Sequence, residues 1–277
     1  MDKIKLMAID FDGTTLNSEK RITDATLQAI SKAIKNGILI VPATGRSISG
    51  IPQQMHDMDI KYVISKNGAI IHDLTNGKEI FHDVMDQNLV CQICSILKNY
   101  DCMLNLTYGL DISVNYSKDI DLFKSIYKRS NDPNAIFTDD IASYLTKTNT
   151  PIDKISCYVN DINQLDAIMA LQSKFLDLNI MNSGFPFIEI NSRMCSKGNG
   201  LKTLVNYLGL KKENVAAIGD SDNDIIMLAY ANYSFAMGNA TKFLKSIADE
   251  VVADNDHDGV KMAIEKVIAR NDKVAIF

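Results

Sequence analysis

Residues 10–16 read Asp10-Phe11-Asp12-Gly13-Thr14-Thr15-Leu16, and they follow directly on the apolar run at positions 6–9. The run is short and continuously apolar, which predicts a strand buried on both faces of a parallel sheet. Gly13 and the two threonines interrupt this pattern, so we expect the chain to turn at the carboxyl end of the strand. Open α/β sheets bind their ligands at that edge.

Asp10 and Asp12 lie two residues apart, and we expect their side chains to share one face or one turn. Two carboxylates held so close repel each other unless a cation neutralises them or one takes up a proton. The stretch therefore indicates a metal site, a protonated carboxyl group, or both. The alternative is an ordinary turn, because Asp and Gly are common turn residues.

Composition limits the classes of function. The 277 residues are enough for one large domain or two smaller ones, and 46% hydrophobic with 23% charged residues is ordinary for a globular protein. The net charge of −5 disfavours a nucleic-acid partner. No apolar run approaches the ~20 residues that cross a bilayer. The first strand starts too close to Met1 for a signal peptide, so we expect a cytoplasmic protein without a membrane partner.

Cysteine spacing offers one competing site. Cys91 and Cys94 have the CxxC spacing of redox and zinc sites, yet they lie in an apolar pattern of helical period. Neither a second CxxC pair nor a suitably spaced histidine pair follows. We therefore expect both to be core-facing helix residues.

Strand-like and helix-like segments alternate in the first and last thirds of the chain. In the first third, strands are expected at 38–41 and 62–65, with a helix at 23–36 and another from about Ser47. This rhythm predicts a parallel sheet with crossover helices, with a hairpin at 69–81 attached to it. In the last third we expect helices at 198–208, 225–230, 242–248 and 260–269 and strands at 214–218, 234–237 and 251–252.

The middle of the chain has a different pattern. Helices are expected at 86–100, 119–128 and 163–175, strands at 103–106, 112–114, 154–159, 178–181 and 187–190, and a polar loop at 130–151. This mixture predicts a separate α+β unit. We therefore expect a Rossmann-like doubly wound parallel core, residues 1–83 and 191–277, with an α+β domain inserted at 84–190.

Three further segments carry candidate site residues. Thr44-Gly45-Arg46 offers a hydroxyl and backbone N–H groups at a helix start, which suits an anion, although Thr-Gly also occurs in plain turns. Lys197 opens a helix, where a lone lysine is usually solvated. Residues 219–224, Gly219-Asp220-Ser221-Asp222-Asn223-Asp224, place three carboxylates behind a buried strand, which favours a metal loop over a solvated acidic loop. The spacing does not match a calcium-binding helix-loop-helix.

Taken in this order, the four segments resemble the motifs of the haloacid dehalogenase (HAD) superfamily. Ser65-x-Asn67-Gly68-Ala69, Lys197-Gly198-x-Gly200-Leu201, Met237-Gly238-Asn239-Ala240 and Asn255-x-x-Asp258-Gly259-Val260 are similar to its Cof-type subfamily, subfamily IIB. The resemblance implies a HAD-like core with a C2B-type α+β cap inserted between the second and third motifs.

The resemblance also implies phosphoryl transfer through an aspartyl-phosphate. Asp10 would be the nucleophile and Asp12 the general acid and base. A bound Mg²⁺ would be held by the carboxylates of Asp10 and Asp220 and the backbone carbonyl of Asp12. The residues implied to contact the phosphoryl group are Thr44, Gly45, Arg46, Lys197 and Asn223. Asp224 would orient Lys197 or a metal-bound water.

We therefore expect a Mg²⁺-dependent phosphatase for small soluble phosphomonoesters: a sugar phosphate, a nucleotide or a cofactor phosphate. A phosphomutase and a non-catalytic phosphate-ligand sensor are the alternatives. Asp12 argues against the dehalogenase branch, which lacks this second aspartate. The substrate is not fixed by the sequence, and we expect a monomer or a weak dimer.

Overall fold

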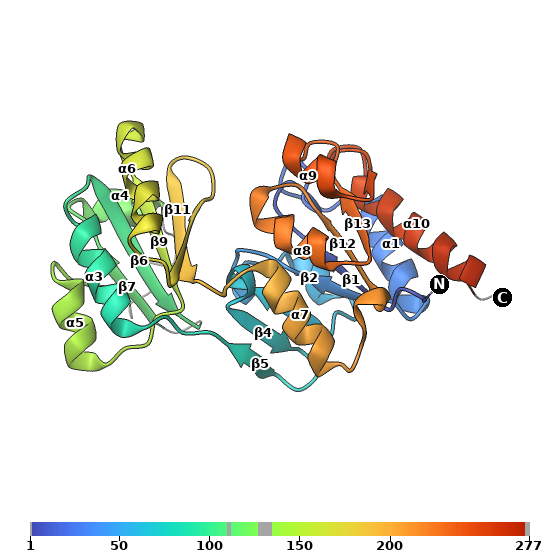
Figure 1. Cartoon of the computed structure of the whole chain (residues 1–277), viewed down its shortest axis with the longest axis horizontal. Coiled ribbons are helices and arrows are strands. Elements are labelled where there is room, and N and C mark those ends of the chain that lie inside the picture. Colours follow the sequence, from blue (N-terminus) through green and yellow to red (C-terminus); the bar gives the residue numbers. More distant parts are fainter. Residues whose placement is uncertain (1, 110–111, 127–134, 275–277) are drawn as a thin grey trace. The chain divides into compact units, whose positions relative to one another are not determined.

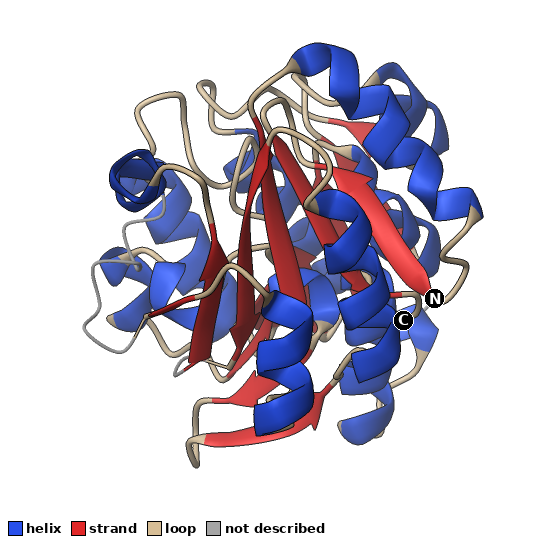
Figure 2. Ribbon diagram, turned by 90° about the vertical axis from the view of Figure 1, so that its left-hand side faces the viewer, coloured by secondary structure: helices blue, strands red, loops and turns tan. Residues whose placement is uncertain are grey.

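The computed structural model describes residues 2–109, 112–126 and 135–274. The chain divides into two compact units (Figure 1). The core unit comprises Met1–Phe81 and Ser196–Phe277, and the inserted unit comprises His82–Cys195. In both units, strands are flanked by helices (Figure 2). Among the described residues, no helix combines the length and the apolar character needed to cross a membrane.

The core unit is built on a five-stranded sheet in which every pair of neighbours is parallel. Its order is β14-β13-β12-β1-β2. Its strands are β1 (Leu6–Ile9), β2 (Leu39–Pro42), β12 (Val215–Gly219), β13 (Tyr233–Ala236) and β14 (Glu250–Val251). β1 lies between β12 and β2, and all four of its residues are buried, as its apolar run predicts.

Helices cover both faces of this sheet. They are α1 (Asp24–Lys35), α7 (Lys197–Tyr207), α8 (Ile225–Tyr230), α9 (Lys242–Ile247) and α10 (Gly259–Val274). α1 packs on α10 and α7 packs on α8, and the two pairs lie on opposite sides of the sheet (Figure 1). The predicted α/β fold with a parallel sheet is therefore confirmed.

The segment at 62–65 departs from the prediction, because it does not join the parallel sheet. β3 (Tyr62–Ser65), β4 (Ile70–Asp73) and β5 (Lys78–His82) form a separate three-stranded sheet, in which β3 and β4 are antiparallel. An isolated bridge, Ala43 to Ile64, and a hydrogen bond from the Thr44 N–H to the Ile64 carbonyl at 2.9 Å link β3 to the chain just after β2. The turn after β3 places Lys66 and Asn67 at positive φ, 49° and 57°, which reverses the chain at once.

The helix expected from about Ser47 is also shorter than predicted. The chain forms one 3₁₀ turn, Ile48–Gly50, and the four-residue helix α2 (Gln53–His56). Pro52 separates them, and Ile51 before it is extended with ψ of 134°. A residue that precedes proline is driven out of the helical region, so the helix cannot run through this point.

The inserted unit contains a six-stranded sheet in the order β10-β11-β9-β6-β7-β8. The strands are β6 (Cys102–Tyr108), β7 (Ile112–Tyr116), β8 (Ile136–Phe137), β9 (Lys154–Val159), β10 (Leu178–Asn182) and β11 (Phe187–Ser192). Its helices are α3 (Gln87–Leu97), α4 (Ile120–Ile126), α5 (Ile141–Thr148) and α6 (Leu165–Met169). The unit is α+β, with its own apolar core.

Two predictions within the inserted unit are wrong. The expected loop at 130–151 contains β8 and α5, while 130–134 lie outside the described residues. α5 buries only Ile141 and Leu145 and takes its N-cap from Asp140, so its apolar signal is short. The helix expected at 163–175 is broken into a 3₁₀ turn, α6 and a second 3₁₀ turn. Residues 127–128 of the expected 119–128 helix are not among those described.

The CxxC pair lies in α3, where the prediction is half right. Cys94 is fully buried, while Cys91 is only partly buried. All five cysteines are free thiols. Burial raises the pKa of the Cys94 thiol above its usual range, which disfavours a reactive thiolate.

Candidate active site

The candidate residues all lie in the core unit, most of them at the carboxyl ends of neighbouring strands. Asp10 follows β1, Thr44 comes two residues after β2, and Asp220 follows β12. Lys197 is the first residue of α7, and Ser196 caps this helix by accepting a hydrogen bond from the Asn199 backbone N–H at 3.1 Å. Parallel strands end at the same edge of a sheet, which brings these loops together.

Lys197 is the centre of the arrangement. Its side chain is only 1% exposed, and Nζ donates to Asp10 Oδ1 at 2.6 Å and to Asp224 Oδ1 at 2.8 Å. A third contact reaches Asn223 Oδ1 at 3.3 Å. Burial disfavours the charged ammonium, but the charges of Asp10 and Asp224 outweigh burial and raise the pKa of Lys197. The lysine is therefore a permanent cation inside the site.

A glycine allows α7 to bring this lysine in. A Cβ on Gly198 would lie 2.5 Å from the backbone carbonyl carbon of Ile226 in α8. Any side chain at that position would push the two helices apart. The start of α7, and with it Lys197, would move away from the carboxylates.

Asp10, Asp220 and Asp224 form an acidic cluster whose ligand atoms all lie within 4.8 Å of one another. Burial raises the pKa of Asp10 well above its ordinary value, and the charges of the other two carboxylates add to this effect while Lys197 opposes it. Burial likewise raises the pKa of Asp220. The cluster therefore carries more negative charge than Lys197 alone can balance.

The three carboxylates differ in how many protein donors they already have. Asp224 accepts from Lys197 through Oδ1, and through Oδ2 from the backbone N–H groups of Asp220 at 3.0 Å and Ser221 at 3.1 Å. These bonds fold the 219–224 loop and occupy both oxygens. Asp10 and Asp220 are left as the oxygen ligands best able to hold a cation.

The turn after β1 is fitted closely to Asp220. Gly13 has φ of +75°, and a Cβ there would lie 2.3 Å from Asp220 Oδ2. Thr14 Oγ1 donates to Asp220 Oδ1 at 2.8 Å, and Thr15 Oγ1 donates to the Asp10 carbonyl at 2.5 Å. Neither threonine has a predicted role, although their place beside Asp12 in the sequence was the available signal.

Asp12 lies apart from the cluster and is paired with Arg46. The guanidinium donates from Nε to Asp12 Oδ2 at 2.7 Å and from Nη2 to Oδ1 at 2.6 Å. Burial raises the pKa of Asp12, but the hydrogen bonds and charge of Arg46, together with those of Lys20 at 3.5 Å, outweigh it and lower that pKa overall. Asp12 is 46% exposed, so a water or a ligand can reach its carboxylate.

Thr44 and its neighbours form the remaining wall. Thr44 is 1% exposed and its Oγ1 accepts from the Arg46 backbone N–H at 3.1 Å. The backbone N–H groups of Lys66 and Asn67 donate to the carbonyls of Arg46 and Thr44, both at 2.9 Å. The turn after β3 therefore fixes the 44–46 loop, which contains Gly45.

The same turn also reaches α7 and the acidic loop. A Cβ on Gly68 would lie 2.2 Å from the Ser196 carbonyl oxygen, and Asn223 Nδ2 donates to Asn67 Oδ1 at 3.3 Å. In the sequence, Ser65-x-Asn67-Gly68-Ala69 is recognisable only as a family motif. The structure shows that this motif links the Thr44 loop to Lys197 and Asn223.

The acidic cluster fits a hard divalent cation such as Mg²⁺. The donor set consists of carboxylate oxygens, which Mg²⁺ prefers, at about 2.0–2.1 Å from the ion. Burial is the main cause of the raised pKa values of Asp10 and Asp220, and the charge of Asp224 adds to it in both. A cation at this point would favour the charged form of both carboxylates.

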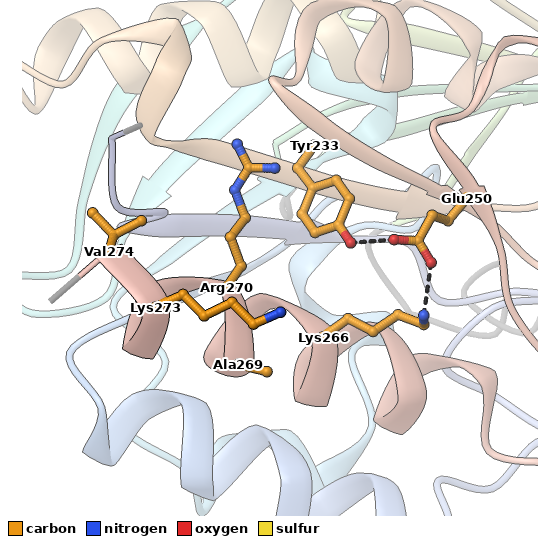
Figure 3. Close-up of a pocket in the computed structure, with 7 residues that line it drawn as sticks. All are labelled: Tyr233, Glu250, Lys266, Ala269, Arg270, Lys273 and Val274. Carbon is orange, nitrogen blue, oxygen red and sulfur yellow. Dashed lines mark hydrogen bonds and ion pairs between the residues drawn. The ribbon is translucent and has the colours of Figure 1, made fainter. Parts of the chain in front are cut away.

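A cavity of about 920 Å³ lies elsewhere in the core unit, lined by residues of β13, β14 and α10 (Figure 3). Its one carboxylate, Glu250, pairs with Lys266 at 2.7 Å and accepts from the Tyr233 hydroxyl. The Arg270 guanidinium lies over the Tyr233 ring, 4.7 Å from its centroid. No residue of the acidic cluster lines this cavity, so it is separate from the candidate active site.

Comparisons with known proteins identify the family of the chain. A family model described as haloacid dehalogenase-like hydrolase matches residues 7–264. The chain is 32% identical over 278 residues to phosphatase YwpJ of Bacillus subtilis (strain 168), covering 93% of this chain and 97% of that protein.

Solved structures give the same result. A haloacid dehalogenase-like hydrolase from B. subtilis has a TM-score of 0.80 at 30% identity, covering 95% of this chain and 99% of that one. The HAD subclass IIB sugar phosphatase BT4131 shares the fold, with a TM-score of 0.79 at 21% identity over 95% of this chain and 98% of that one. The resemblance seen in the motifs is confirmed, and the chain belongs to the haloacid dehalogenase-like hydrolases.

Proposed function

We propose that this hydrolase is a Mg²⁺-dependent phosphatase that cleaves small soluble phosphomonoesters through an aspartyl-phosphate on Asp10. One observation carries the proposal: a buried ammonium, Lys197, lies between Asp10 and Asp224, with Asp220 close by. Phosphoryl transfer requires a nucleophile surrounded by fixed positive charge, because negative charge spreads over the phosphoryl oxygens in the transition state.

In the first step, a carboxylate oxygen of Asp10 forms a bond to phosphorus and the bond from phosphorus to the ester oxygen breaks. Asp12 gives its proton to that leaving oxygen. In the second step a water attacks phosphorus, Asp12 takes up its proton, and Asp10 leaves as a free carboxylate with inorganic phosphate as product. The two steps replace one difficult displacement.

Lys197 contributes charge and position. Its 2.6 Å contact favours the ionised form of Asp10, and the ammonium can donate to a phosphoryl oxygen. Asp224 is proposed to orient this lysine, which its 2.8 Å contact supports. Asn223, also in contact with Lys197, is placed for a further phosphoryl contact.

Mg²⁺ would be held by the carboxylates of Asp10 and Asp220 and the backbone carbonyl of Asp12. When bound, the ion neutralises negative charge on the transferring phosphoryl group. The binding of Thr14 Oγ1 to Asp220 supports this assignment, because it fixes the carboxylate that would serve as ligand.

Arg46 is proposed to exchange partners during the reaction. In this structure its guanidinium is bidentate on Asp12. A phosphoryl group that binds Arg46, Thr44 and the Gly45 backbone would draw the guanidinium from Asp12. Without that partner the pKa of Asp12 rises, and the carboxyl group can hold the proton that the leaving oxygen requires.

We further propose that the inserted unit is the cap of the family and supplies the residues that select the substrate. Support comes from its position in the sequence between the Arg46 and Lys197 segments and from its separate α+β fold. Lids of this kind commonly complete an active site.

The test is phosphate release from a panel of sugar phosphates, nucleotides and cofactor phosphates, measured with Mg²⁺ and with a chelator. Wild type is compared with Asp10→Asn and with a control at an exposed aspartate, Asp59→Asn. Release that requires both Mg²⁺ and Asp10 supports the proposal. Full activity of Asp10→Asn would refute the mechanism. Transfer of phosphate between positions of one substrate would establish a mutase, and binding without release a sensor.

A further inference from the structure

Two asparagines hold the outer side of the turn that follows β1. Asn239 Nδ2 donates to the Gly13 carbonyl at 2.7 Å, and Asn255 Nδ2 donates to the Leu16 carbonyl at 2.9 Å. The two are also linked, because the Asn255 backbone N–H donates to Asn239 Oδ1 at 3.2 Å. Both belong to motifs, 237–240 and 255–260, that the proposed chemistry leaves without a role.

The segment that carries Asn239 also holds the acidic loop. After β13, the backbone N–H of Met237 donates to the Gly219 carbonyl and that of Thr241 donates to the Asp220 carbonyl, both at 3.0 Å. The segment 237–241 therefore makes contacts on two sides. It binds the turn after β1 through a side chain and the Asp220 loop through its backbone.

The segment that carries Asn255 is anchored just as firmly. The Gly238 N–H donates to the Ala253 carbonyl at 3.0 Å, which ties the segment with Asn255 to segment 237–241. Asp258, at φ of 57°, accepts from the Thr23 hydroxyl at 2.5 Å at the start of α1. A Cβ on Gly259 would lie 2.1 Å from the Ala253 carbonyl oxygen, so the backbone here is closely packed.

We infer that Asn239 and Asn255 are positioning residues that hold the 13–16 turn so that the Asp12 carbonyl and the Asp220 carboxylate meet at one cation. Asparagine is suited to position 239 because its one side-chain amide both donates, to the Gly13 carbonyl, and accepts, from the Asn255 N–H. Aspartate would lose the donor to Gly13. The expected effect on Mg²⁺ binding rests on the proposed function. The ordering of the 13–16 turn does not, and it can be measured without a metal.

The exposure of the two asparagines indicates that they contribute little to the overall stability of the core unit. Asn239 is exposed and Asn255 is only partly buried, so neither side chain belongs to the apolar core. Truncating either one should leave the unfolding of the core unit nearly unchanged. The effect should be confined to the turn and to what it binds.

The first experiment measures Mg²⁺ affinity by calorimetry in Asn239→Ala and Asn255→Ala. The matched control is Asn36→Ala, which removes a similar bond, from Asn36 Nδ2 to the Lys32 carbonyl at 2.8 Å, at the end of α1. Loss of a group that orients a metal ligand typically weakens metal affinity or activity by about 10–100-fold. We expect about tenfold weaker Mg²⁺ binding in both variants, a fall in kcat larger than any rise in KM, and no change in the control.

The second experiment measures hydrogen exchange in the metal-free protein. The backbone N–H groups of Thr14, Thr15 and Leu16 bond to the carbonyls of residues 10 and 11 within the turn. We expect these three to exchange faster in Asn239→Ala and Asn255→Ala than in Asn36→Ala, with β2 unchanged. Exchange equal to that of the control would overturn the inference. Failure of the wild type to bind Mg²⁺ would instead refute the proposed function, and the exchange result would still decide whether the turn is held by these asparagines.

Discussion

Replacing Lys197 with methionine should destabilise the acidic cluster, because it removes the ammonium that offsets part of the cluster's negative charge. Methionine keeps most of the side-chain volume and removes only the ammonium that binds Asp10 and Asp224. Because Lys197 is 1% exposed and Asp224 is fully buried, water cannot take over its contacts. Removing one partner of a buried ion pair costs about 3–5 kcal/mol, since the charge that remains is uncompensated.

The expected change in melting temperature follows from that free energy. One kcal/mol corresponds to about 2–4 °C for a unit of this size, so Lys197→Met should lower the Tm of the core unit by roughly 6–20 °C at neutral pH in chelator. Loss of Lys197 also raises the pKa of Asp10 further. A carboxyl group whose folded-state pKa is raised stabilises the protein below its unfolded pKa and loses that contribution as pH rises. The difference in Tm between wild type and Lys197→Met should therefore shrink on acidification.

Mg²⁺ provides a second readout of the same variant. An ion that binds Asp10 and Asp220 would supply part of the missing positive charge, so Mg²⁺ should raise the Tm of Lys197→Met more than that of wild type. The control is Lys202→Met, which changes an exposed lysine on the same helix. A Tm for Lys197→Met within about 2 °C of this control would refute the buried ion cluster as described.

Three further predictions concern the same loops. Gly13→Ala should weaken Mg²⁺ binding at least about tenfold in calorimetry, whereas Gly77→Ala, at a similar φ of +70° with nothing within 4 Å of its Cβ, should leave it unchanged. In chelator, the unfolding free energy of wild type relative to Asp10→Asn should fall as pH rises, because the folded-state pKa of Asp10 is raised. The measurement is the unfolding free energy from urea titrations at several pH values, and an equal dependence on pH in the two proteins would contradict the prediction. Arg46→Gln should raise the pKa of Asp12, so the decline of kcat/KM at high pH should move upward; an unchanged pH–rate profile would argue against the pairing.

The parts of the fold that the sequence predicts are those whose signal is local. β1 and β12 are buried on both faces of a parallel sheet, so they read as unbroken apolar runs, each followed at once by carboxylates. α1 is bounded by Thr23, whose hydroxyl accepts from the Thr26 backbone N–H at 3.1 Å, and by Gly37 at φ of 75°. Both signals can be found without knowledge of the rest of the chain.

The parts that the sequence did not predict depend on contacts between distant segments. The reversal after β3 requires positive φ at Lys66, which no local propensity of lysine indicates. The bidentate pair of Arg46 with Asp12 joins residues 34 positions apart, and Asn239 meets Gly13 across 226 positions. Such partners become visible only once the strand order places the loops at one edge of the sheet.

The charges of the site explain why its members are divided into two groups. The acidic cluster and Lys197 leave an excess of two negative charges if all groups are ionised, which a divalent cation would cancel. Asp12 and Arg46 neutralise each other and lie more exposed. In the proposed mechanism an arriving phosphate ester would add negative charge, and Arg46 would exchange an exposed carboxylate for it. In the proposed mechanism the same exchange would raise the pKa of Asp12, so binding of the substrate would prepare the acid that its cleavage requires.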